Sequence, residues 1–301
     1  MISYLKRNEI DDKRWDAVVA GSSAETLYAY SWYLDLVAPR WDALVMGDYS
    51  HIMPVVWSRK YGISYLYQPL YTQQLGVFSR HFADPTVISA MLKQLRGRFR
   101  LGDLQFNAAN LVAESEGFSI QDRSNYVLPL IKSYEEIEAG YSQNAKRNIK
   151  RARGQKELVA KPVTALELLR LKRENDVIAR SDADYRWQER LFTGLEARGC
   201  VELRGLFRNG DLLAGLCFAF SQKRAIYLLS ASTEEGKQAR AMFWLIDDFI
   251  QEHAATEMLL DFEGSNIHGI ARFFSGFGAE PELYQHLHFS RLPRFFRKRG
   301  M

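Results

Sequence analysis

EMLLDFEGSNIHGIARFFSGFGAEP, residues 257–281, is the stretch that decides the fold of this chain. Its first apolar run, residues 258–262, predicts a buried strand. Asp261 and Glu263 place two carboxylates at the C-terminal end of that strand, and Gly264 follows as a turn residue. The stretch therefore predicts a strand that ends in acids.

A short helix is expected after the turn. Ser265 and Asn266 are its N-cap candidates, and Gly276 or Gly278 is expected to end it. One side of this helix carries only apolar residues, namely Ile270, Phe273, Phe274 and Phe277. Open α/β sheets bind ligands where a strand ends beside the start of a helix, so this is the first place to look for a site.

Composition indicates an ordinary globular protein. The chain has 301 residues, with 47% apolar and 25% charged residues, enough for one large domain or two of common size. Its two cysteines do not form a disulfide framework. We find no apolar run long enough for a transmembrane segment and no apolar signal region at the N-terminus, so we expect a cytoplasmic protein.

Two halves with the same expected order of elements follow one another, without a repeat at the level of residues. Each is expected to contain helices, antiparallel strands, a further helix and more strand, which predicts an α+β fold with mostly antiparallel sheets. The expected strands are residues 43–46, 52–58, 63–67, 103–108 and 126–131, then 201–207, 212–220, 225–232, 258–262 and 283–289. We expect domains at residues 1–158 and 159–301.

A basic helix is expected over residues 134–154. Its second half places Lys146 over Lys150 and Arg147 over Arg151, and such like-charge pairs each cost a few tenths of a kcal/mol. An anion would relieve that repulsion, so Arg147 and Lys150 are candidates for binding phosphate. The C-terminal tail holds a second basic cluster, Arg291, Arg294, Arg297, Lys298 and Arg299, which reads equally well as a solvated tail.

Several common catalytic motifs are absent. The sequence has no phosphate-binding loop, no dinucleotide fingerprint and no serine nucleophile motif. Its six histidines have no cysteine or carboxylate partners at metal-ligand spacing, so no metal is expected. His286 and His288 share a strand face and are the nearest approach to a metal pair.

A strand-to-helix crossing remains as the candidate for chemistry. The apolar strand at residues 226–230 leads into a polar loop, and Gly236 is expected at the start of a long helix over residues 236–254. If this strand and the one ending in Asp261 diverge, they leave a slot suited to acyl transfer onto an amine. Asp261 or Glu263 would take the proton from the amine, and a strand N–H near Ser230 would stabilise the oxyanion. The alternative is structural: helix capping and an ion pair with Arg272.

These features resemble a known family. The order of strand, loop, long helix, Asp-Phe-Glu-Gly strand end and the run ARFFSGFGAEP is similar to the C-terminal half of Fem-type peptidyltransferases, which are tandem members of the GNAT (Gcn5-related N-acetyltransferase) superfamily. The run SQNAKRNIKRARGQ, residues 142–155, is similar to a second motif of that family, with matches at Arg147, Ile149, Lys150 and Ala152. The sequence departs from the family at Phe274, where a lysine is usual, and at residues 234–240, which lack the full pyrophosphate motif.

The resemblance implies two GNAT-like domains and an acyl- or aminoacyltransferase. The acyl donor would be acyl-coenzyme A or aminoacyl-tRNA, and the partner a phosphate-bearing small molecule or tRNA. The expected catalytic residues are Asp261, Glu263 and Tyr284, and the expected substrate-binding residues are Arg147, Lys150, Ser230 and Arg272.

Two other functions fit the same sequence. A non-catalytic RNA- or nucleotide-binding protein would explain the basic clusters. A structural, complex-forming role would explain a degenerate tandem domain, and would leave the slot filled by side chains.

Overall fold

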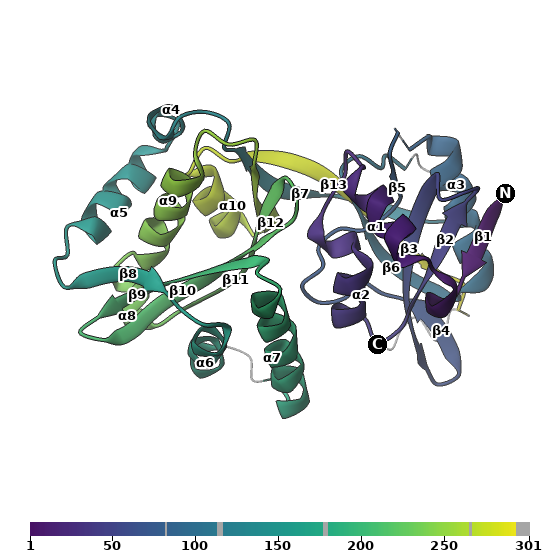
Figure 1. Cartoon of the computed structure of the whole chain (residues 1–301), viewed down its shortest axis with the longest axis horizontal. Helices are drawn as coiled ribbons and strands as arrows, with labels where there is room; N and C mark the ends of the chain where they lie inside the picture. Colours follow the sequence, from purple (N-terminus) through teal and green to yellow (C-terminus); the bar gives the residue numbers. More distant parts are fainter. Residues whose placement is uncertain (82, 113–116, 177–179, 265–266, 293–301) are drawn as a thin grey trace. The chain divides into compact units, whose positions relative to one another are not determined.

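The computed structural model describes residues 1–81, 83–112, 117–176, 180–264 and 267–292 (Figure 1). The chain divides into two compact units. The first consists of Met1–Ser124 together with Glu282–Met301, and the second is Asn125–Pro281. Each unit has its own group of strands and its own hydrophobic core.

The strands of the first unit are mostly antiparallel, and β4 and β6 are a parallel pair. Strands β1, β2, β3 and β4 pair antiparallel, β4 pairs with β6 in parallel, and β6 pairs with β13 antiparallel. The short strand β5 (Phe78–Ser79) pairs with β3. The bounds are β1 Ile2–Leu5, β2 Trp41–Met46, β3 His51–Lys60, β4 Ile63–Leu66, β6 Leu101–Phe106 and β13 Glu280–Ser290.

The second unit repeats this order. Its strands β8, β9, β10 and β11 pair antiparallel, β11 pairs with β12 in parallel, and β12 pairs with β7 antiparallel. The bounds are β7 Ser119–Pro129, β8 Leu158–Pro162, β9 Val201–Arg208, β10 Asp211–Phe220, β11 Arg224–Ser232 and β12 Leu259–Gly264. The architectural duplication expected from the sequence is therefore present in the strand order.

The unit boundaries differ from the expected division at residues 158 and 159. The last strand of the first sheet, β13, comes from the end of the chain, whereas the last strand of the second sheet, β7, comes from its middle. Ile137, Ala145 and Ile149, which precede the expected boundary, lie in the core of the second unit. The expected cut would separate these residues from the sheet they cover.

The helices are α1 Asp12–Ala20, α2 Ser31–Val37, α3 Pro85–Arg98, α4 Tyr134–Ala139, α5 Gln143–Arg153, α6 Ala165–Asn175, α7 Asp182–Ala197, α8 Glu234–Gln238, α9 Ala241–His253 and α10 His268–Ser275, with 3-10 turns at Arg7–Glu9 and Leu27–Ala29. Among the helices within the described ranges, none is both long enough and apolar enough to cross a bilayer.

Two helices expected as continuous are each broken in two. The expected helix over residues 134–154 is interrupted because Gly140 ends α4 and the Ser142 hydroxyl caps α5, accepting from the Ala145 N–H at 3.2 Å. The expected helix over residues 236–254 is interrupted because Arg240 adopts a left-handed backbone, with φ 64°, between α8 and α9.

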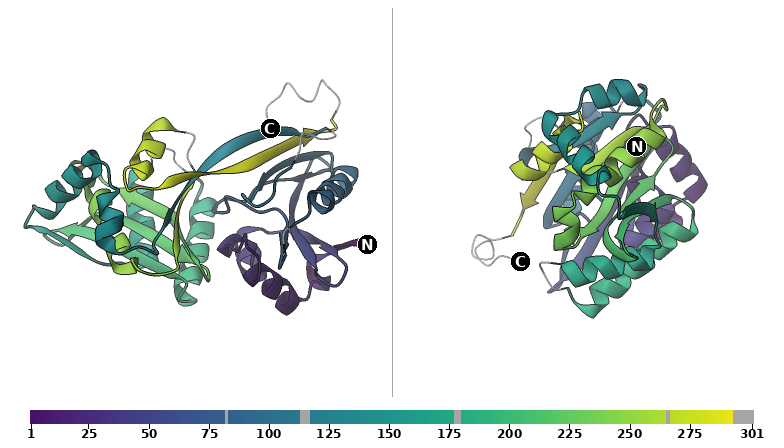
Figure 2. Two further views of the ribbon diagram at one scale, coloured as in Figure 1. Left: turned by 90° about the horizontal axis from the view of Figure 1, so that it is seen from above. Right: turned by 90° about the vertical axis from the view of Figure 1, so that its left-hand side faces the viewer.

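Helices cover both faces of the second sheet (Figures 1 and 2). On one face α4, α5, α9 and α10 share a single hydrophobic core with the strands. On the other face α6 packs on β9, β10 and β11, and α7 packs beside α6. This arrangement holds β11 and β12 in the middle of a three-layer unit.

Candidate functional site

Strands β11 and β12 separate after a short parallel pairing. They are in register at Arg224 opposite Leu259 and Ala225 opposite Leu260, and the last pair is Ile226 opposite Asp261. Beyond this pair β11 continues for six residues to Ser232, and β12 for three to Gly264, without pairing to one another. The opening expected between the two strands is therefore present.

The end of β12 has an irregular backbone. Its pairing with β7 is regular as far as Asp261 and resumes only at Gly264, so Phe262 and Glu263 form a bulge. Glu263 has φ 58°, a left-handed conformation that is uncommon for a residue with a side chain. The second carboxylate of the sequence motif thus lies at a bulge, half-buried, where the two strands have parted.

Asp261 holds this bulge in place. Its Oδ1 accepts a hydrogen bond from the Glu263 N–H at 2.8 Å, and its Oδ2 pairs with the Arg224 guanidinium at 2.5 Å. The Asp261 side chain is only 3% exposed, and that of Arg224 is 17% exposed. Both oxygens of Asp261 are therefore engaged, and its ionic partner is Arg224 rather than the Arg272 considered from the sequence.

Strand β11 carries a bulge of its own. Cys217 of β10 lies opposite Leu229, but the next residue, Phe218, lies opposite Tyr227, so Leu228 has no counterpart on β10. Ser230, two residues further on, pairs with Leu216 and is half-buried. This bulge lies in the pairing with β10, on the part of β11 that no longer pairs with β12.

Aromatic rings cluster around the two strands where they part. Tyr227 of β11 lies 6.3 Å from Phe262 of β12 and 5.9 Å from Phe274 of α10, measured between ring centroids. Phe262 stacks on Phe274 at 4.9 Å, and Phe243 of α9 contacts Phe273 at 4.8 Å. Phe274, which stands where the Fem-type family usually has a lysine, is thus a buried member of this cluster.

The Tyr227 hydroxyl stays protonated at neutral pH. Burial raises the pKa of Tyr227 to about 12, while the side chain of Ser230 acts in the opposite direction. The hydroxyl lies 3.6 Å from the Met242 sulfur, which places it against the first turn of α9. Tyr227 is a polar group at this opening that the sequence did not single out.

The long helix begins five residues later than expected. Gly236 lies inside α8, where its N–H is capped by the Thr233 hydroxyl at 3.0 Å. A Cβ at position 236 would come within 2.4 Å of the Leu213 carbonyl, so this glycine is required by the packing of α8 on β10. The start of α9 follows Arg240 and has no side-chain cap. Of the two helix starts, that of α9 suits an anion better, since α8 has Glu234 and Glu235 in its first turn.

The expected phosphate-binding residues lie on a different element from the two parted strands. Arg147 and Lys150 lie on the exposed side of α5, whose other side packs into the core through Ala145, Ile149 and Ala152. Arg147 donates to the Asn144 side chain at 3.0 Å. Lys150 forms no side-chain hydrogen bond or ion pair within the described ranges.

Another member of the basic cluster has a structural partner. Arg153 pairs at 2.8 Å with Asp247 of α9, whose side chain is fully buried, and so ties α5 to α9. Arg272 is exposed near the end of α10. The N-cap candidates Ser265 and Asn266 lie outside the described residues, and so does most of the C-terminal basic cluster. The described residue that precedes α10 is Ile267.

Tyr284, one of the three expected catalytic residues, belongs to the first unit. It is buried in β13, and its hydroxyl donates to the Gln105 side chain at 3.1 Å. Its catalytic role remains an expectation from the sequence.

Two groups of side chains within the described ranges resemble metal-ligand sets. Glu202, Glu252 and His253 place three ligand atoms within 4.8 Å of one another. Arg204 already forms ion pairs with both of these glutamates, so a cation would compete with the guanidinium. His286 and His288 both contact Asp103, at 2.8 and 3.4 Å. We assign no metal to either group.

Known structures share this architecture. FemX superposes with a TM-score of 0.65 at 13% identity, over 98% of this chain and 99% of that one. A tandem GNAT protein from the clavulanic acid biosynthesis pathway gives 0.61 at 13% identity, over 97% and 99%. L-PGS from Bacillus licheniformis gives 0.55 at 11% identity, over 97% and 93%.

The chain has the tandem GNAT fold. No protein-family model matches the sequence, and no curated protein matches it. The fold class expected from the resemblance is confirmed. At these identities the comparisons establish the fold, and the chemistry must be argued from the site.

Proposed function

We propose that the protein is an acyl- or aminoacyltransferase that transfers an acyl group to an amine at the opening between β11 and β12. One observation carries this proposal: the two parallel strands part immediately beyond Asp261 and leave Glu263 on an irregular backbone at the point of separation. The coarser conclusion, a transferase fold, rests on the similarity to FemX, the tandem GNAT protein and L-PGS.

Glu263 would act as the general base. The amine nitrogen attacks the acyl carbonyl to form a tetrahedral intermediate, and the carboxylate takes the proton that the nitrogen loses. Collapse of the intermediate breaks the bond to the leaving group and completes the amide. Asp261 is less suited to this task because both of its oxygens are already engaged by Arg224 and the Glu263 N–H.

The edge of β11 would stabilise the developing charge. Backbone N–H groups near the Leu228 bulge and Ser230 are suited to binding the oxyanion, since β12 no longer pairs with this part of the strand. The protonated Tyr227 hydroxyl is suited to donating to the leaving group. The aromatic cluster below them would exclude water and so strengthen both interactions.

The donor would be acyl-coenzyme A or aminoacyl-tRNA. Either carries phosphate, and the uncapped start of α9 beside Arg240 is the better helix terminus for it. Arg147 and Lys150 would bind a more distant anionic part of a substrate. A cytoplasmic location stays a prediction from the sequence.

A thermal-shift screen followed by a transfer assay tests the proposal. Acetyl-coenzyme A, longer acyl-coenzyme A species and charged tRNA are screened, because a ligand of the folded form raises the melting temperature. With the donor found, Glu263→Gln is expected to lower the transfer rate by about 100-fold or more at unchanged melting temperature. Arg147→Ala is expected to raise KM. Full activity of Glu263→Gln would refute the assignment.

A non-catalytic RNA- or nucleotide-binding role is the second candidate, favoured by the exposed cations of α5. It predicts tRNA binding whose affinity falls steeply with salt, with no turnover of any acyl donor. Turnover that depends on Glu263 would exclude it.

A further inference from the structure

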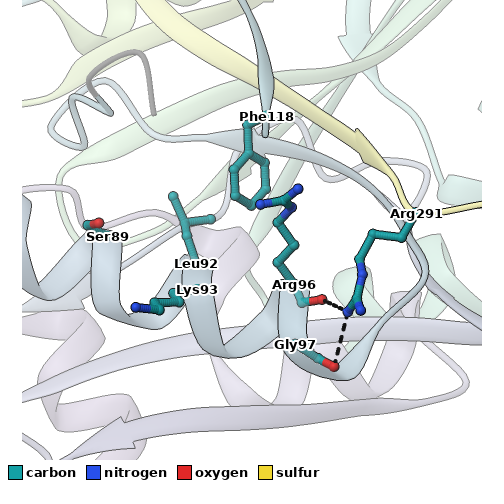
Figure 3. A pocket seen from close by; sticks show the side chains of 7 residues that line it. All are labelled: Ser89, Leu92, Lys93, Arg96, Gly97, Phe118 and Arg291. Atoms are coloured by element: carbon teal, nitrogen blue, oxygen red, sulfur yellow. Dashed lines mark hydrogen bonds between the residues drawn. The ribbon is translucent and has the colours of Figure 1, made fainter. Parts of the chain in front are cut away.

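A cavity of about 330 Å³ lies in the first unit, on elements that the proposed transfer site does not use (Figure 3). One side is formed by α3, and the other by Phe118 just before β7 and Arg291 just after β13. The lining residues are Ser89, Leu92, Lys93, Arg96, Gly97, Phe118 and Arg291. Three separate segments of the chain therefore meet around it.

Positive charge dominates this cavity. Lys93, Arg96 and Arg291 are all cationic at neutral pH, and none of the lining residues is acidic. Three cations around a space of this size repel one another, and an anion placed among them would relieve that repulsion.

Both arginines are held by the fold. The Arg291 guanidinium donates to the carbonyl oxygens of Arg96 at 2.6 Å and Gly97 at 3.4 Å, which caps the C-terminus of α3 (Figure 3). The Arg96 guanidinium packs over Gly117, where a Cβ would come within 2.1 Å of its Nη2. Ordered cations lose little conformational entropy when they bind a ligand.

Two polar groups at the rim are available for a ligand. The Lys93 ammonium and the Ser89 hydroxyl are exposed, and neither makes a hydrogen bond or ion pair with any residue in the described ranges. Leu92 and Phe118 supply apolar surface beside them, and the Phe118 ring is itself set edge-on against Phe289 at 5.1 Å. The cavity therefore combines cationic donors with an apolar wall.

We propose that this cavity binds a small molecule that carries a phosphate group next to an apolar or planar part. The arginines bind the phosphate, the exposed Lys93 side chain, which Figure 3 shows directed away from them, turns to reach it, and Leu92 and Phe118 contact the remainder. The cavity volume falls at the lower end of the range for ligand sites, which fits a small phosphate ester. The proposal is independent of the transfer reaction.

Isothermal titration calorimetry of the full chain tests this site, with phenyl phosphate, inorganic phosphate and phenol as probes. Phenyl phosphate is expected to bind with one site per chain, inorganic phosphate more weakly, and phenol not at all. Lys93→Gln is expected to weaken phenyl phosphate binding about tenfold, since a charge-assisted hydrogen bond is lost. Because Lys93 is exposed, this variant should fold normally.

A matched control separates a site from general attraction to a basic protein. Lys156→Gln removes an exposed lysine from the second unit and is expected to bind phenyl phosphate like the wild type. Gly117→Ala, which displaces the Arg96 guanidinium, is expected to weaken binding as Lys93→Gln does. Absence of binding by the wild type at low salt, or equal weakening by Lys93→Gln and Lys156→Gln, would overturn the proposal.

Discussion

Glu263 has a backbone conformation that few glutamates adopt, and its neighbours maintain it. The positive φ angle costs on the order of 1 kcal/mol or more, and the hydrogen bond from its N–H to Asp261 offsets part of that cost. Asp261 in turn depends on Arg224. A chain of contacts therefore runs from Arg224 through Asp261 to the position of the proposed base.

Replacement of Arg224 tests this chain of contacts. Arg224→Met leaves the Asp261 carboxylate buried without its cation, so we expect a loss of about 3 kcal/mol in the free energy of unfolding. We also expect the transfer rate to fall more than substrate binding, because the Glu263 backbone loses its support. Lys223→Met is the control, because it removes the exposed cation one residue earlier in the sequence. Both variants are measured by urea denaturation and steady-state kinetics. Equal stability of the two variants would contradict this account.

The two acids Asp261 and Glu263 could be predicted from the sequence, but the ion pair between Arg224 and Asp261 could not. The two acids stand out because they end an apolar run. Arg224 lies 37 positions earlier, and only the parallel register of β11 and β12 brings it to Asp261. Tyr227 was missed because a tyrosine in an apolar strand has no signature that distinguishes a site from a core.

At the scale of elements, polar residues explain where the expected helices break. Ser142 is an N-cap residue in the middle of an apparently helical run, and its capping role could have been predicted from the capping preference alone. The left-handed Arg240 could not, since arginine has no preference for that conformation. The hairpin between β9 and β10 forms at Asn209 and Gly210, two residues that favour positive φ angles, and both have them.

Helix α9 is tied to β9 by a polar network with a testable pH dependence. Arg204 pairs with Glu202, Asp248 and Glu252, and His253 bonds to Glu202 at 2.9 Å. Burial acts to raise the pKa of Glu202, but the hydrogen bond from His253 and the charge of Arg204 lower it overall. The folded state therefore holds the charged carboxylate more strongly than the unfolded chain does.

The sign of the effect follows from linkage. The contribution of Glu202 to the free energy of unfolding is fully present above the ordinary glutamate pKa of about 4.3, and it is lost as pH falls through the lower folded value. Between about pH 6 and pH 3 the wild type should lose more of that free energy than Glu202→Gln. Urea denaturation across this interval measures the difference. Parallel pH profiles would show that Glu202 contributes nothing.

At the scale of the whole molecule, each unit contains a strand that pairs with another strand distant in sequence. Strand β13 pairs with β6 in the first unit, and β7 pairs with β12 in the second. Polar and apolar residues occur in both β7 and β13. Neither sequence indicates which neighbouring strand it pairs with. A division at residue 158 was therefore reasonable from the sequence, although contacts divide the chain at residues 124 and 281.

Two fragments distinguish these divisions. Residues 125–281 retain β7, α4 and α5, which supply Leu128, Ile137 and Ile149 to the core, and should unfold cooperatively in urea. Residues 159–301 lack those elements and carry β13 without its partner β6, so they should not. Cooperative unfolding of the second fragment alone would show that the strand assignment is wrong.

Hydrogen exchange measured by mass spectrometry, with and without an acyl donor, tests the central claim most directly. If the opening between β11 and β12 holds the activated acyl group, the donor should slow exchange at residues 227–232 and 262–264. A panel of acyl-coenzyme A species and charged tRNA that leaves both strand ends unprotected would contradict the account.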